Sequence, residues 1–117
     1  FPETGKKKNE ETYINESVLG HKFLNKAYKA TYEVGSDNFS IFILGNSSSE
    51  EVRKTVDAYL KAAGQDASDS GSGKYMLTDG YNGTIFLAWK ENQIVIISGL
   101  AKDQSEIADQ YTSEILK

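Results

Sequence analysis

The sequence predicts an α+β fold in which an antiparallel sheet of about five strands carries two helices on one face. The prediction rests on short apolar runs, on turn residues between them, and on two stretches with the apolar spacing of an amphipathic helix. The expected order of elements is ββ-α-βββ-α. Hairpin-type connections between neighbouring runs favour antiparallel pairing.

The first expected hairpin begins at Tyr28. Apolar and polar residues alternate over 28–34, which is typical of a half-buried strand. Turn residues follow at 35–38, and the next run, 39–44, reads Phe-Ser-Ile-Phe-Ile-Leu and is apolar on both faces. We therefore expect the second strand to be more buried than the first.

A helix is expected after Asn46. Ser47 and Ser48 each precede a glutamate by three residues, so either can form a capping box. Apolar residues then recur at helical spacing, and Gly64 suits the left-handed conformation that ends many helices. The apolar stripe consists of Val52, Val56, Tyr59, Leu60 and Ala63. Residues 65–74 are rich in Gly, Ser and Asp and predict a mobile connection.

Three further strands are expected at 75–78, 84–89 and 93–98. The last of them, Gln-Ile-Val-Ile-Ile-Ser, is the most β-prone segment and is apolar on both faces, so we place it at the centre of the sheet. Asp103 is the expected N-cap of a final helix. The apolar stripe of that helix consists of Ile107, Ala108, Tyr111 and Ile115.

Apolar side chains on both faces of the inner strands create a packing problem. Two helices on one face leave the other face exposed to solvent. The chain would then lose the stabilisation from burying that apolar surface, which is about 25 cal/mol per Å² and several kcal/mol in total. We expect residues 18–24 to cover part of that second face. The rest is expected to pack on a partner such as a second copy of the chain, on another lobe, or on a bound apolar group. Most of the seven tyrosines are expected to lie on core faces and to pack there rather than to form a stacking platform; they include Tyr28, Tyr32, Tyr59, Tyr75, Tyr81 and Tyr111.

Length and composition limit the function. A chain of 117 residues fits one domain, and we expect a flexible charged tail at 1–12 and a single α+β domain at 13–117. The net charge of −4 has the wrong sign for binding nucleic acid. No apolar run approaches the roughly 18 residues of a membrane-spanning helix, so no transmembrane segment is expected. The absence of Cys excludes thiolate nucleophiles and Cys-ligated metals, and we expect no metal and no cofactor.

The candidate binding residues are Asp79, Tyr81, Asn82 and His21. The loop at 79–83 gathers a carboxylate, a phenol and an amide, which suits a sugar or a peptide end. Its alternative is a hairpin loop with glycines at positive φ and polar side chains bonded to local backbone. His21 is either the base of a hydrolase or a partly exposed imidazole beside an apolar anchor, and no partner at helical spacing accompanies it for a metal site.

Several short motifs are similar to a known family. They are Leu19-Gly20, Phe23-Leu24-Asn25-Lys26, Tyr28, Ala30, Tyr32, the helix after Gly45, and Asp79, Tyr81 and Gly83 before an apolar strand. Together they resemble the second lobe of an uncharacterised bacterial family, a domain of unknown function, over residues 18–117. Members of that family look like exported or lipid-anchored proteins in which two similar α+β lobes pack together. The resemblance implies an extracytoplasmic location and carries over no catalytic residue.

The sequence thus predicts a non-catalytic, extracytoplasmic binding or assembly module, not an enzyme. Its apolar sheet face is expected to meet another lobe or subunit. The alternative is a carrier or sensor that holds a small apolar or sugar ligand between the sheet and the helices.

Overall fold

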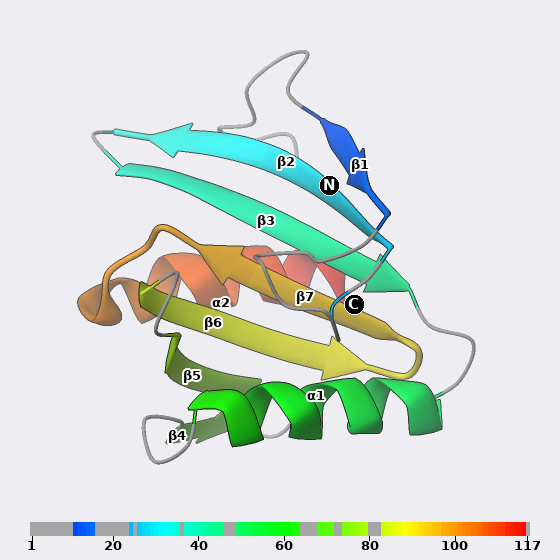
Figure 1. Cartoon of the computed structure of the whole chain (residues 1–117). Helices are drawn as coiled ribbons and strands as arrows, with labels where there is room; N and C mark the ends of the chain where they lie inside the picture. The colour runs from blue at the N-terminus through cyan, green and yellow to red at the C-terminus, as the bar shows by residue number, and fades with distance from the viewer. Residues whose placement is uncertain are drawn as a thin grey trace.

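The computed structural model describes residues 11–15, 24, 26–35, 37–45, 49–63, 68–71, 74–79 and 83–116. Within these ranges, seven strands form one antiparallel sheet, and two α-helices accompany it (Figure 1). The predicted α+β class and antiparallel pairing are therefore confirmed. The strand number differs, because the sheet has seven strands where the sequence predicts about five.

The elements follow the predicted order with additions at both edges of the sheet. The strands are β1 (Thr12–Ile14), β2 (Ala27–Val34), β3 (Asp37–Gly45), β4 (Ser68–Gly71), β5 (Lys74–Asp79), β6 (Gly83–Lys90) and β7 (Gln93–Ser98). The helices are α1 (Ser49–Ala63), a short 3-10 helix η3 (Lys102–Gln104) and α2 (Ser105–Ile115). The strand order is β1-β2-β3-β7-β6-β5-β4, so β7 is central, as its composition predicts.

The two additional strands lie at the sheet edges. At one edge β1 pairs with β2, with Tyr13 opposite Tyr28. At the other, β4 pairs with β5 inside the segment that the sequence assigns to a mobile connection, so that assignment is wrong for residues 68–71. The run Ser-Asp-Ser-Gly has no strand-like alternation of its own. It is a strand because β5 offers it unpaired backbone groups.

The two helices cover opposite faces of the sheet, and the prediction of two helices on one face is wrong. One core packs under α1 and contains Ile94 and Ile96 of β7, while a second core packs under α2 and contains Val95 and Ile97. We call the two sides the α1 face and the α2 face. Figure 1 shows α1 in front of the sheet and α2 behind it. The three layers explain how β3, β6 and β7 can be apolar on both sides.

Each helix packs its predicted stripe on the sheet, although Leu60, Ile107 and Ile115 are only partly buried and the side chain of Ala63 lies outside the described residues. Val52, Val56 and Tyr59 of α1 are buried on the α1 face, and Leu24 lies fully buried in the same core. The rest of the segment expected to cover the second face, residues 18–23, lies outside the described residues. Since Leu24 lies on the α1 face, the part of this segment that the structure describes packs with a helix rather than in place of one.

An aromatic triangle anchors α2. The ring of Tyr111 meets Tyr32 and Phe39 edge-on at centroid distances of 5.0 and 5.4 Å, and those two rings stack at 5.4 Å. Such pairs add about 0.5–1.5 kcal/mol each beyond burial of their area. Burial of Tyr111, followed by the nearby charge of Glu114, raises the pKa of its phenol above the ordinary value. The triangle therefore ties α2, whose backbone lies over β6 and β7, to β2 and β3 through the ring of Tyr111.

The start of α2 differs from the prediction. Asp103 lies inside η3 rather than at the N-cap of α2, and the N-cap position is Gln104. The side chain of Gln104 turns back and accepts a hydrogen bond of 2.7 Å from the backbone N–H of Ala101. The 3-10 turn thus takes the place of the expected aspartate cap.

Candidate functional site

The predicted binding loop is described only at its ends. Asp79 is the last residue of β5, and its backbone pairs with Gly83 at the start of β6. Gly83 has a φ of 77°, the left-handed conformation that the hairpin interpretation requires of it. Tyr81, Asn82 and His21 lie outside the described residues. The structure therefore places the backbone of one of the four predicted site residues.

A cleft opens between α2 and the β5–β6 side of the sheet. Its volume is about 500 Å³, and its lining includes Lys74, Ala88, Lys90, Glu91, Thr112 and Leu116. Thr112 and Leu116 come from the end of α2, while Ala88 belongs to β6 and carries only a methyl group into the space beside the helix. We call this hollow the β6–α2 cleft. The small side chain at Ala88, beside the last turn of α2, leaves room for it.

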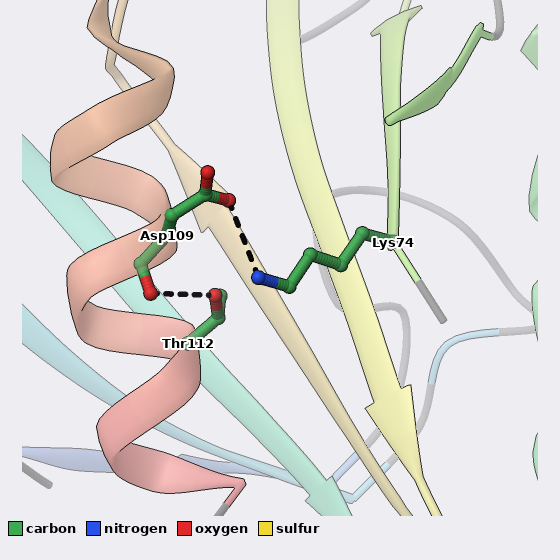
Figure 2. Close-up of polar contacts among 3 residues, drawn as sticks. All are labelled: Lys74, Asp109 and Thr112. Atoms are coloured by element: carbon green, nitrogen blue, oxygen red, sulfur yellow. Dashed lines mark hydrogen bonds and ion pairs between the residues drawn. The ribbon is translucent and has the colours of Figure 1, made fainter. Parts of the chain in front are cut away.

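One ion pair bridges the two walls beside the cleft. Figure 2 shows the side chain of Lys74 reaching past β6 to Asp109 on α2, where the Nζ atom lies 3.5 Å from Oδ1. The side chains keep 31% and 59% of their surface exposed, so water screens the pair and its contribution to stability is small. The buried Thr112 donates its hydroxyl to the carbonyl oxygen of Asp109 at 3.3 Å. The Lys74 ammonium has three donors, and the ion pair engages it loosely.

A pair of exposed tyrosines lies at the β1–β2 edge. Tyr13 and Tyr28 face each other across the two strands, with ring centroids 5.0 Å apart and ring planes tilted by 56°. They are 48% and 59% exposed. The cross-strand partner of Tyr28 on the other side is Ile43, a half-buried residue of the α2 face. We call Tyr13 and Tyr28 the tyrosine pair.

Sequence reasoning placed Tyr28 in the core, and that placement is wrong. The alternation of β2 correctly puts Tyr28 on the same face as Ala30 and Tyr32, which are buried. Exposure of Tyr28 follows from where α2 lies, because the helix contacts β6 and β7 and only its Tyr111 ring reaches β2, at Tyr32, which leaves Tyr28 uncovered. Period-two alternation identifies a face but carries no information on where a covering helix ends.

Metal-binding clusters and membrane-spanning helices are both absent from the described residues. No group of three or more His, Asp or Glu side chains gathers there in a way that could hold a metal ion. Among the described helices, none is both long and apolar enough to cross a membrane.

Comparison with known proteins returned no similarity. No protein-family model matches the chain, and no match was found among curated proteins or solved structures. The resemblance to a two-lobed bacterial family therefore stays an expectation from the sequence.

Proposed function

We propose that this chain is a non-catalytic, extracytoplasmic binding or assembly module that associates with a second copy of itself through the tyrosine pair. The observation that supports the proposal is the exposure of two aromatic rings in mutual contact at an edge of the sheet. Single exposed apolar side chains are normal on a protein surface, whereas apolar residues gathered in one place mark an interaction site. The extracytoplasmic location rests on the family resemblance alone.

This surface replaces the broad apolar face that the sequence predicts. Because each face of β7 has its own helix, the central strands do not need a partner to cover them. Among the described residues, the large exposed apolar side chains are Tyr13 and Tyr28, which form a corner of the α2 face with Ile43 beside it. The partner proposed from the sequence is therefore expected at this corner rather than over the middle of the sheet.

The charges beside the tyrosine pair suit a two-fold contact between identical chains. Glu11 precedes β1 and Lys26 precedes β2, and both are exposed. Since β1 and β2 run antiparallel, these residues flank the aromatic pair at opposite ends. A two-fold axis through the pair and perpendicular to the strands would bring each Lys26 towards Glu11 of the other copy, whereas an axis along the strands would bring like charges together. Opposite charges so placed favour self-association in one orientation.

The size of the surface predicts weak association. A buried aromatic side chain contributes about 150–250 Å², so two half-exposed rings fall well short of the roughly 800 Å² per partner of a stable complex. We therefore expect a reversible dimer that forms only at high protein concentration.

Sedimentation velocity over a range of concentrations tests the proposal. The wild-type chain should show a rising mean sedimentation coefficient, and Tyr13→Ser combined with Tyr28→Ser should abolish the rise. Lys54→Ser, an exposed change on the outer side of α1, is the control and should behave as wild type. A wild-type chain that stays monomeric at every concentration contradicts the proposal.

The β6–α2 cleft favours a second candidate, the carrier or sensor. Its volume of about 500 Å³ lies within the range of roughly 300–1,000 Å³ that small-ligand sites occupy. It also lies between sheet and helix, where the sequence interpretation places such a ligand. Native mass spectrometry of protein purified without denaturation tests this candidate, because a carrier retains a co-purifying mass. Protein that carries no added mass, and gains none when incubated with a cell extract, would contradict it.

A further inference from the structure

We propose that the β6–α2 cleft binds a small oxyanion, a carboxylate or a phosphate group, through the ammonium groups of Lys74 and Lys90. The inference rests on the second candidate function and names the chemical class of its ligand. It is independent of the tyrosine pair, which lies at the opposite edge of the sheet.

The first argument is the position of the two lysines. Lys74 at the start of β5 and Lys90 at the end of β6 both line the cleft, because β5 and β6 are antiparallel and these two ends lie together. Their pairing register sets Lys74 beside Ala88, two residues before Lys90. Two cationic side chains from neighbouring strands therefore border one hollow, with the methyl group of Ala88 between them. Ammonium groups arranged in this way form charge-assisted hydrogen bonds with oxyanions.

The second argument is the looseness of the existing ion pair. Asp109 lies 3.5 Å from the Lys74 nitrogen and is 59% exposed. Its carboxylate can therefore rotate away from Lys74 towards solvent with little loss of free energy. Lys74, which is 31% exposed, cannot leave the wall of the cleft as easily. An incoming oxyanion can thus take the place of Asp109 as the partner of Lys74. The Ser113 hydroxyl on the cleft wall offers a further donor.

The negative groups around the cleft limit the affinity. Glu91 follows Lys90 in the β6–β7 turn, and Asp109 borders the other wall. The C-terminal end of α2, at Leu116, presents carbonyl groups with a partial negative charge. We therefore expect weak binding, with a dissociation constant on the order of millimolar for a bare anion. The apolar contacts offered by Ala88 and Leu116 should favour an anion with a short apolar body.

An NMR titration of the full chain tests the inference. Sodium phosphate and sodium propionate are the two probes, and sodium chloride at matched ionic strength separates binding from screening. Saturable shifts of backbone amides at 88–91 and 112–116 are expected with one or both probes. Saturation by phosphate alone or propionate alone identifies which oxyanion the cleft prefers.

Three variants make the test specific. Lys74→Met keeps the length of the side chain and should weaken binding about tenfold. Asp109→Asn removes the competing carboxylate and should tighten binding several-fold, a gain that a merely structural ion pair would not produce. Lys54→Met, on the outer side of α1, is the control and should leave the titration unchanged.

Failure of the inference is distinguishable from failure of the carrier function. Shifts that do not saturate, or that are equal in wild type and Lys74→Met, overturn anion binding. If native mass spectrometry still finds a neutral ligand, the carrier function stands while its oxyanion class is wrong. If neither experiment finds a ligand, both are wrong.

Discussion

Ile96 and Ile97 are neighbours in β7, yet they lie in two different cores. Ile96 packs beneath α1 and Ile97 beneath α2, and both are fully buried. A strand that is apolar on both faces therefore needs no second protein to cover it when each face has its own helix. A partner is therefore expected at the edge of the sheet rather than over its middle.

Because β7 has a core on each face, truncating Ile96 or Ile97 should reduce stability by a similar amount. Ile96→Ala and Ile97→Ala should each lower the free energy of unfolding by about 2–5 kcal/mol, because each leaves a cavity in a packed core. Chemical denaturation measures both. Gln93→Ala, at an exposed position of the same strand, is the control and should change stability by less than about 0.5 kcal/mol. An Ile97→Ala loss as small as the control would mean that α2 does not cover its face.

Gly99 should tolerate no side chain. Its φ is 110°, and a Cβ atom there would lie 2.9 Å from the carbonyl oxygen of Asn38 and 3.0 Å from Cα of Phe39. Gly99→Ala should therefore cost about 2 kcal/mol or more through backbone strain and overpacking. Gly35→Ala has a positive φ but open space and should cost about 1–2 kcal/mol. Gly45 has neither a positive φ nor a close neighbour, so the melting temperature of Gly45→Ala should be close to that of wild type.

Glu91 is a site where glycine should stabilise the protein. Its φ of 55° in the β6–β7 turn costs a residue with a side chain about 1–2 kcal/mol, whereas the extra chain entropy of glycine costs about 0.5–1 kcal/mol. Glu91→Gly should therefore raise the unfolding free energy by roughly 0.5–1 kcal/mol. Glu33→Gly, at an exposed position inside β2, should lower it instead. A destabilised Glu91→Gly variant would show that the turn depends on the glutamate side chain.

Stability should fall at high pH partly because of Tyr111. Burial raises the pKa of its phenol in the folded chain, so above the ordinary value of 10.0 the unfolded chain releases this proton first. The contribution of Tyr111 to the free energy of unfolding is fully present below pH 10.0. It is lost as the pH rises through the higher pKa that the phenol has in the folded chain. Denaturation curves from neutral pH upwards should show a shallower decline for Tyr111→Phe than for wild type. Parallel declines would contradict the assignment.

Much of the local structure can be predicted from particular residues. The alternation from Tyr28 to Val34, the continuous apolar run before Gly45 and the stripe of α1 each identify an element that the structure confirms. These patterns are local, because periods of two and of 3.6 residues follow from backbone geometry. The edge strand β4 has no such pattern, since backbone pairing with β5 holds it in place.

The candidate surfaces could not be predicted in the same way. The cleft depends on Ala88 facing the last turn of α2, and these residues meet only because β6 and α2 pack together. The tyrosine pair depends on β1, whose three residues are too few for a recognisable pattern. Asp79, Tyr81, Asn82 and His21 stay predictions from the sequence.

From its own residues the chain determines which side chains share a face of each strand and which side of each helix is apolar. Only the tertiary structure decided that α1 and α2 cover opposite faces of the sheet, and hence that Tyr28 stays exposed while Tyr32 is buried. The physical reason is that an apolar stripe requires a helix to pack against something apolar without specifying which face. When both faces of a sheet are equally apolar, two factors decide which face each helix covers. They are the lengths of the connections and the fit of large side chains, such as Tyr111 against Tyr32 and Phe39.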